Sequence, residues 1–265
     1  MQIDTFLEIG NQHKVCEDYI VAGYDPVPYI ILSDGCSTAN NSEMGSRILC
    51  HLAKQYLKYN QAELNDIDYW KLGHWVIHNA EQTARQLGLS ISCLTATLTV
   101  AYYINGQMRI MMYGDGSFIK MFDSENFDIT TIEYSNNAPY YLVYLIDNNR
   151  HDLYDQKSPV KKVNYIYPDG STDFDEFAYD NPFDMRVSMN PMEGILIASD
   201  GIDSFLQGTT SIPAQDVIPT FIAFKNIKGE FLKRRLNKQM KVYGRNNIGH
   251  FDDLSVGAFL KVEEM

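Results

Sequence analysis

Apolar and polar positions along the chain change their period several times, and each change marks a predicted element. Runs in which apolar residues alternate or cluster predict strands, and runs in which they recur every three or four positions predict helices. The predicted strands span residues 3–9, 17–24, 27–33, 93–104, 107–114, 117–122, 127–134, 140–146, 193–199 and 254–262. The predicted helices span residues 42–60, 67–87, 201–207, 214–224 and 229–241.

The order of these elements indicates the fold class. Strands follow strands through tight turns such as Asn105-Gly106 and Asp115-Gly116, and the helices come in pairs. This order is typical of an α+β protein whose antiparallel sheets are covered by helices, and not of a repeating strand–helix–strand protein. We expect one domain over residues 1–265, with a polar, tyrosine-rich and irregular flap at about residues 147–183.

The net charge and the number and spacing of the cysteines argue against several classes of function. The net charge of −12 argues against a nucleic-acid-binding protein and offers no basic surface to an anionic membrane. No apolar stretch is long enough to span a bilayer, and the first residues lack the pattern of a signal peptide. Four cysteines without CxxC spacing favour a cytoplasmic protein with neither a disulfide framework nor a thiolate zinc site.

Three separated apolar runs end in Asp-Gly, at Asp34, Asp115 and Asp200. A single Asp-Gly is commonly only a turn, because both residues tolerate positive φ. Repeated carboxylates at the ends of buried strands are costly unless they are paired or bind a metal. Further carboxylates flank the predicted strands, at Glu17, Asp18, Asp252 and Asp253. Oxygen ligands without nearby Cys or His partners suit Mg²⁺ or Mn²⁺ rather than Zn²⁺.

The motifs in this set resemble those of a known family. They are "HKVCEDYI", "ILSDG", "CLTATL", "MYGDGSF", "LIASDGIDSF" and "FDDLSVGAF", in that order along about residues 8–260. In order and spacing they are similar to the motifs of the metal-dependent protein phosphatases, the type 2C serine/threonine family, and in detail to those of a divergent bacterial-type member. The resemblance implies a four-layer α-β-β-α sandwich of two antiparallel sheets flanked by helix pairs.

The resemblance also implies a metal centre with two Mg²⁺ or Mn²⁺ ions. Asp34 would be shared by both ions. Glu17 and the carbonyl of Gly35 would complete the first ion, and Asp200 and Asp252 the second.

Further roles follow from the same resemblance. Asp34 and Asp18 would be the catalytic residues, with Asp18 orienting the waters on the ions. Asp115 and Asp200 would hold a third, weaker ion. The nucleophile would be a hydroxide that bridges the two ions, with no covalent phospho-enzyme.

The sequence departs from the family at the residues that handle substrate. The family usually has an arginine that clamps the substrate phosphate four positions before the glutamate, and this chain has His13, with Lys14 beside it. Cys36 stands where some members have a histidine that is a proposed general acid. The terminal Asp-Asn is Asp252-Asp253. His13 is accordingly the residue predicted to bind the substrate phosphate.

The function that these motifs favour is metal-dependent hydrolysis of phosphoserine and phosphothreonine in cytoplasmic proteins. A phosphoprotein substrate and a cognate serine/threonine kinase are the implied partners. One alternative is a catalytically weak phosphatase-like domain that binds a partner or senses a ligand. Another is a metal-dependent hydrolase of a small phosphoester. Retention of the four principal ligands favours the enzyme over the binding domain.

Overall fold

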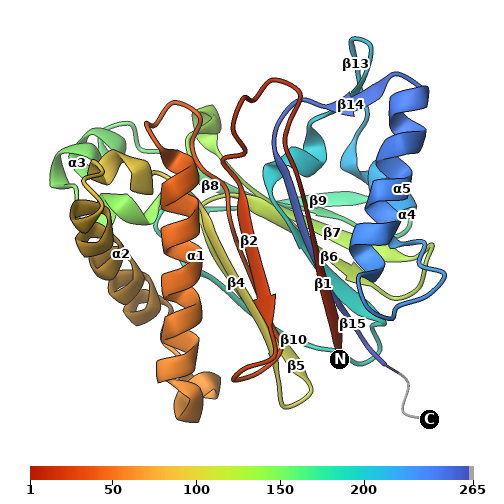
Figure 1. The fold of residues 1–265 in the computed structure, drawn as a ribbon, viewed down its shortest axis with the longest axis horizontal. Coiled ribbons are helices and arrows are strands. Elements are labelled where there is room, and N and C mark those ends of the chain that lie inside the picture. The colour runs from red at the N-terminus through yellow and green to blue at the C-terminus, as the bar shows by residue number, and fades with distance from the viewer. Residues whose placement is uncertain (263–265) are drawn as a thin grey trace.

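The computed structural model describes residues 1–262. Two antiparallel sheets pack face to face in its centre (Figure 1). The five-stranded sheet has the order β10 (Phe183–Ser188), β5 (Gln107–Tyr113), β4 (Leu98–Ile104), β3 (Tyr29–Ser33) and β2 (Tyr19–Gly23). The seven-stranded sheet has the order β1 (Gln2–Glu8), β15 (Leu254–Leu260), β11 (Gly194–Ala198), β6 (Gly116–Met121), β7 (Phe127–Tyr134), β8 (Val160–Ile166) and β9 (Thr172–Ala178). A small third sheet contains β13 (Thr210–Ser211), β12 (Phe205–Gln207) and β14 (Ile248–His250).

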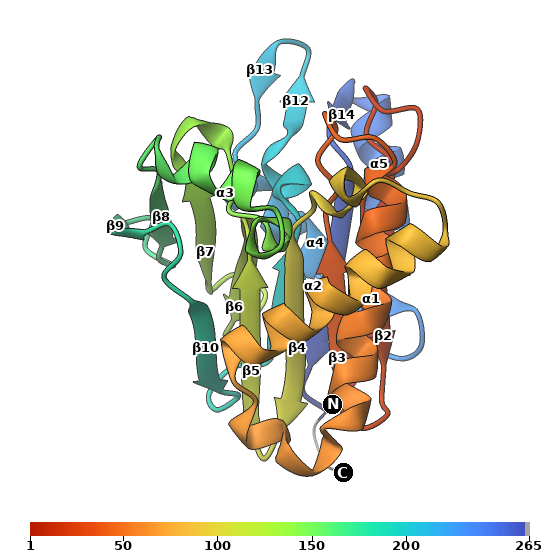
Figure 2. The ribbon, with the colours of Figure 1, turned by 90° about the vertical axis from the view of Figure 1, so that its left-hand side faces the viewer.

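A pair of helices covers the outer face of each large sheet. The helices α1 (Ser42–Tyr59) and α2 (Tyr69–Gln86) pack on the five-stranded sheet, as Figure 2 shows. The helices α4 (Ala214–Ile222) and α5 (Phe231–Arg245) pack on the seven-stranded sheet. The predicted α-β-β-α sandwich is therefore confirmed. The remaining helical segments are α3 (Asn148–Asp155) and the 3₁₀ helices Gln61–Asp66, Ile91–Leu94, Ser135–Asn137, Leu142–Leu145 and Asp200–Asp203.

The central strands are apolar on both faces because each face meets a different layer. In β3, Ile31 packs toward α1 and α2, whereas Ile30 and Leu32 pack into the layer between the sheets. Ile197 and Phe259 enter that inter-sheet layer from the opposite sheet and are fully buried there. Burial on both faces explains why these strands lack the clean alternation of a one-sided sheet.

Two predicted elements are wrong. Residues 140–146 do not form a strand, because Leu142–Leu145 is a 3₁₀ helix whose apolar side chains fill the space beside α2. Residues 201–207 do not form a helix. A 3₁₀ turn ends at Asp203, and Phe205–Gln207 is the strand β12, paired with β14.

The segment predicted to be a flap, residues 147–183, is not irregular, because it contains α3, β8 and β9, and its role as a flap stays a prediction. Every residue of β9 is exposed. Its backbone is nevertheless held by pairing along its whole length to β8. No helix of the described residues has the length and apolar character that crossing a membrane requires.

Candidate active site

Segments that are distant in the sequence carry the predicted site residues to one end of the sandwich (Figure 1). In the five-stranded sheet, Tyr19 at the start of β2 pairs with Ser33 at the end of β3. In the seven-stranded sheet, Ala198 at the end of β11 pairs with Ser117 and Val256, near the starts of β6 and β15. Antiparallel pairing thus gathers the residues that directly flank these strand ends, namely Glu17, Asp18, Asp34, Asp115, Asp200, Asp252 and Asp253.

Asp34 and Gly35 extend the pairing of β3 with β4. The amide of Asp34 donates a hydrogen bond to Thr97 Oγ1 at 3.0 Å, and the amide of Thr97 donates to the carbonyl of Asp34 at 2.8 Å. Gly35 forms an isolated bridge with Ala96. A Cβ atom at Gly35 would lie 2.9 Å from the carbonyl oxygen of Glu17, so only glycine allows this close approach. The backbone that carries Asp34 is therefore rigidly placed.

Asp115 does not lie in a hairpin, and that expectation is wrong. It links β5, in the five-stranded sheet, to β6, in the seven-stranded sheet, and these two strands do not pair. The flanking Gly114 and Gly116 have φ values of 98° and 134°, in the region that favours glycine. The two glycines let the chain cross from one sheet to the other and leave Asp115 at the crossing point.

Asp18 is buried, with 2% of its surface exposed, and it lacks a full set of partners. Its Oδ2 accepts a hydrogen bond from Ser199 Oγ at 2.8 Å, and Ser199 Oγ accepts one from the amide of Ser255 at 3.0 Å. Oδ1 is buried and has no hydrogen-bond partner among the described residues. Burial raises the pKa of Asp18 to about 7, although hydrogen bonds from its neighbours oppose the shift. An orphaned buried carboxylate oxygen is a feature that a bound cation would explain.

The carboxylates of Asp34, Asp115 and Asp200 interact strongly with one another. Burial raises the pKa of Asp34 well above its usual range, and the charges of Asp18, Asp200 and Asp115 raise it further. Burial and the charge of Asp252 raise the pKa of Asp200 to about 6. Burial and the charge of Asp200 raise the pKa of Asp115. The predicted residues are therefore brought together, in a cluster that resists ionisation unless cations balance it.

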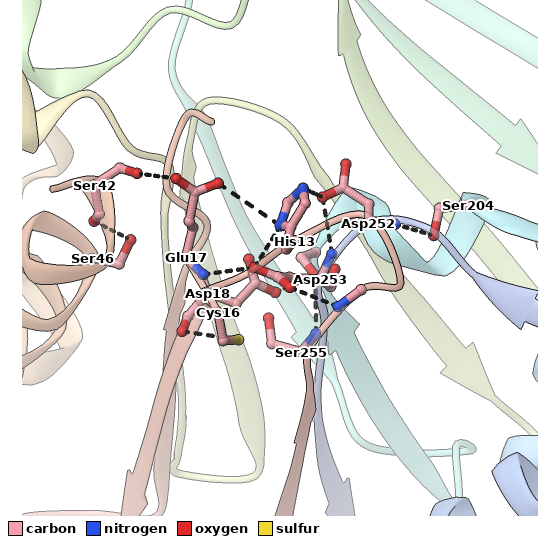
Figure 3. A network of polar contacts seen from close by, with 12 residues as sticks. His13, Cys16, Glu17, Asp18, Ser42, Ser46, Ser204, Asp252, Asp253 and Ser255 are labelled. Atoms are coloured by element: carbon pink, nitrogen blue, oxygen red, sulfur yellow. Dashed lines mark hydrogen bonds and ion pairs between the residues drawn. The ribbon is translucent and has the colours of Figure 1, made fainter. Parts of the chain in front are cut away.

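His13 lies against three carboxylates (Figure 3). Its Nδ1 is 3.0 Å from Asp253 Oδ2 and 3.8 Å from Glu17 Oε2, and its Nε2 is 3.4 Å from Asp252 Oδ1. Burial lowers the pKa of His13, but the contact with Asp253 and the charges of Asp253, Asp252 and Glu17 outweigh it and raise the pKa. Both ring nitrogens face the protein's own carboxylates, so phosphate binding by His13 stays a prediction.

Asp253, one of the carboxylates that precede the last strand, has a structural role. It is 1% exposed, and its carboxylate accepts hydrogen bonds from the amides of Gly10 at 2.7 Å and Glu17 at 2.6 Å. Glu17 in turn accepts a hydrogen bond from Ser42 Oγ at 2.7 Å (Figure 3). Ligand atoms of His13, Glu17 and Asp253 lie within 4.8 Å of one another. Because both oxygens of Asp253 already bind amides, this trio fastens the N-terminal loop to the start of β15.

A cleft of about 430 Å³ opens beside Asp115, Asp200 and Asp252. Glu133 and Asp203 also line it, and the sequence analysis had given neither of them a role. A phosphate group would be repelled from five carboxylates, so the cleft suits a phosphoester only when cations reverse the local charge.

The raised pKa values predict how stability depends on pH when no metal is bound. The pKa of Asp18 is about 7 in the folded protein, against an ordinary value of 3.8, so between these values the folded protein holds a proton that the unfolded chain releases. Stability should therefore fall as pH rises, by up to about 4 kcal/mol from this group. Asp200 and His13, whose pKa values are also raised, act in the same direction.

Urea unfolding in chelator at pH 5 and at pH 7.5 measures the part of this effect between pH 5 and the folded pKa of about 7, which is about 3 kcal/mol for Asp18. Millimolar Mn²⁺ should remove most of the difference, because ions that bind only the folded protein stabilise it and keep the carboxylates ionised. Asp18→Asn in chelator should also reduce it. Equal stability of the metal-free protein at the two pH values would contradict the expectation.

The described geometry can be compared with that of known proteins. A family model described as protein phosphatase 2C matches residues 10–241. A bacterial serine phosphatase is similar in structure with a TM-score of 0.63 and 14% identity, over 100% of both chains. The serine/threonine phosphatase Stp1 from Staphylococcus aureus has a TM-score of 0.59 and 13% identity, over 100% of this chain and 96% of that one.

The serine/threonine phosphatase of S. agalactiae has a TM-score of 0.56 and 15% identity, over 98% of this chain and 99% of that one. At these identities the solved structures show the shared fold. No curated protein matches the chain. The family match covers most of the chain and confirms the resemblance that its motifs predicted. The chain belongs to the protein phosphatase 2C family.

Proposed function

We propose that this protein hydrolyses phosphoserine and phosphothreonine in phosphoproteins, with two Mg²⁺ or Mn²⁺ ions bound at the carboxylate cluster. The observation that carries the proposal is the convergence of Asp34, Asp115 and Asp200 from both sheets, with their pKa values raised mainly by burial. The orphaned oxygen of Asp18 beside them supports it. Membership of a phosphatase family and the phosphatases among the structural neighbours support the same function.

The ions would be held in the arrangement that the motifs suggested. Asp34 would bind both ions. Glu17 and the Gly35 carbonyl would bind the first ion, and Asp200 and Asp252 would bind the second. Asp115 and Asp200 would hold a third, weaker ion. When bound, the ions would supply an activated water and neutralise the phosphate.

The protein's own residues prepare this site. Ser199 and Asp18 hold each other in place under the cluster, and Asp253 fixes the backbone of Glu17. When it is protonated, His13 places a positive charge beside Glu17 and Asp252 and thereby lowers their mutual repulsion. A phosphate contact by His13 would require its ring to leave these carboxylates. If His13→Arg and His13→Ala leave the Michaelis constant for a phosphomonoester within twofold of wild type, that contact is excluded.

We propose that the protein acts in the cytoplasm. A cognate serine/threonine kinase would phosphorylate the protein substrate. The four cysteines, Cys16, Cys36, Cys50 and Cys93, are all free thiols, which suits a reducing compartment.

Hydrolysis assays on the purified protein test the proposal. We expect release of phosphate from phosphoserine and phosphothreonine peptides that depends on Mn²⁺ and stops in chelator. If small phosphomonoesters are hydrolysed as efficiently as the peptides, the protein is instead the hydrolase of small phosphoesters. Stabilisation by Mn²⁺ without hydrolysis of any substrate would indicate the catalytically weak binding domain. The engagement of both His13 nitrogens by carboxylates is the observation that keeps this second candidate open.

A further inference from the structure

A second cavity, of about 520 Å³, lies between α3 and the loop that follows Asp34. Its polar lining consists of Thr38, Asn40, Ser92, Thr95, Arg150 and Lys157, together with Tyr144 and Tyr154. None of its lining residues carries a carboxylate, although the protein as a whole has a net charge of −12. The positively charged side chains of Arg150 and Lys157, surrounded by hydroxyl and amide groups, suit the binding of an anion. This cavity is therefore opposite in charge to the cleft beside Asp200.

Arg150 is held in position and is connected to the backbone of the active-site loop. Its Nη1 donates a hydrogen bond to Thr95 Oγ1 at 2.8 Å, and its Nε is 3.3 Å from Asp147 Oδ2. The carbonyl of Thr95 accepts a hydrogen bond from the amide of Cys36 at 2.9 Å. Cys36 follows Asp34 by two residues, so a single residue, Thr95, separates the guanidinium from this loop.

Lys157 adds a second positive charge just after the end of α3. It has no ion-pair partner among the described residues, whereas the charge of Arg150 is partly balanced by Asp147. A lysine without a local partner is free to bind an external anion. In Figure 2, α3 lies at the same end of the sandwich as the ends of the strands that carry the cluster.

We propose that this cavity binds a second anionic group of the phosphoprotein substrate, close in sequence to the phosphate that is hydrolysed. The group would be an oxyanion, either the carboxylate of an aspartate or glutamate or a second phosphate. Thr95 connects Arg150 to Cys36, two residues after Asp34, so the cavity adjoins the loop that carries Asp34. The anion would therefore lie within a few residues of the phosphorylated residue. This inference rests on the proposed function, because it assumes that a phosphoprotein is hydrolysed at the carboxylate cluster that contains Asp34.

Kinetics on phosphoserine peptides test the inference. The peptides carry aspartate, phosphoserine or alanine at one of the four positions before or after the phosphoserine that is hydrolysed. Wild-type protein should prefer the better-placed acidic peptide to the alanine peptide by about tenfold in kcat/KM, and Lys157→Met and Arg150→Met should remove most of that preference. Lys157→Met should retain the activity of wild type toward the alanine peptide and an aryl phosphate, because neither substrate fills the cavity. For Arg150→Met, which also loses its contact with Thr95, the readout is the ratio of kcat/KM for the acidic and alanine peptides. Lys238→Met, at an exposed position of α5, is the matched control and should retain the preference.

Further measurements distinguish a carboxylate from a phosphate in the cavity. They also distinguish failure of this inference from failure of the proposed function. A larger gain from phosphoserine than from aspartate would identify the cavity as a phosphate site. Binding of non-hydrolysable phosphonate peptides, measured by calorimetry, does not need turnover. If no substrate is hydrolysed, the proposed function fails, but tighter binding of the acidic peptide that depends on Lys157 would still support the cavity. Equal binding and equal kcat/KM of acidic and alanine peptides, or an undiminished preference in both Met variants, would overturn the inference.

Discussion

Asp34→Asn should lose more than about a hundredfold of the Mn²⁺-dependent phosphatase activity while the protein remains folded. The charges of Asp18, Asp200 and Asp115 all act on Asp34 and raise its pKa. An amide of the same shape keeps the backbone pairing with Thr97, because that pairing uses the main chain of Asp34. It removes the charge that both proposed ions share, and loss of a metal-site residue that only supports the ligands already costs about 10–100-fold.

The measurement is kcat for an aryl phosphate at saturating Mn²⁺, with melting temperatures in Mn²⁺ and in chelator. In chelator the variant should melt no lower than wild type, because the substitution relieves repulsion within the cluster. The stabilising effect of Mn²⁺ should shrink at the same time. Glu176→Gln, on the exposed strand β9, changes the net charge equally and should behave as wild type. Activity within threefold of wild type in a folded Asp34→Asn would remove Asp34 from the metal centre.

Arg109→Met should destabilise the protein by about 3 kcal/mol, the second large effect that we expect. Arg109 in β5 is 4% exposed and forms a bidentate ion pair with Asp184 in β10, with Nη2 at 2.6 Å from Oδ2 and Nε at 2.9 Å from Oδ1. Its guanidinium also donates to the hydroxyl of Tyr102 at 3.2 Å and to the carbonyl of Ile67. Removal of the cation leaves Asp184 and the carbonyl of Ile67 without their partner.

Urea unfolding measures this cost, and an exposed ion pair provides the control. Lys58→Met breaks the ion pair between Lys58 and Asp25, whose side chains are 61% and 73% exposed, and should cost less than about 1 kcal/mol. Arg109→Met combined with Asp184→Leu should recover part of the loss, because no charge is then left unpaired. A loss below 1 kcal/mol in Arg109→Met alone would show that the pair contributes little to holding β10 on the sheet.

The sequence predicts most of the layers because burial leaves a local pattern. The helices α1, α2, α4 and α5 and the core strands occur close to their expected positions. The exposed strand β9 was not predictable in this way, since neither of its faces is apolar and only pairing with β8 defines it. Residues 140–146 are apolar without a decisive period, so the sequence did not distinguish a 3₁₀ helix from a strand.

The sequence predicted the carboxylates of the candidate site but not most of the residues that contact them. An Asp-Gly pair after an apolar run marks a strand end, but it does not say whether the next strand pairs with the last or joins the other sheet, as it does after Asp115. The contacts of His13 with Asp252 and Asp253 join positions about 240 residues apart, and no local pattern encodes them. Arg150 was missed for the same reason, because its partner Thr95 lies in another segment.

The position of β15 has a consequence for how the protein is made. This strand lies between β1 and β11, so the first strand of the chain has no neighbour in its sheet until residues 254–260 have been synthesised. Pairing between such distant segments forms slowly, and an unpaired edge is exposed to wrong partners in the meantime. Asp253, which holds the amides of Gly10 and Glu17, also arrives at that late stage. A nascent chain that has not yet reached residue 260 therefore cannot assemble this site, and it acquires the site only when the seven-stranded sheet closes.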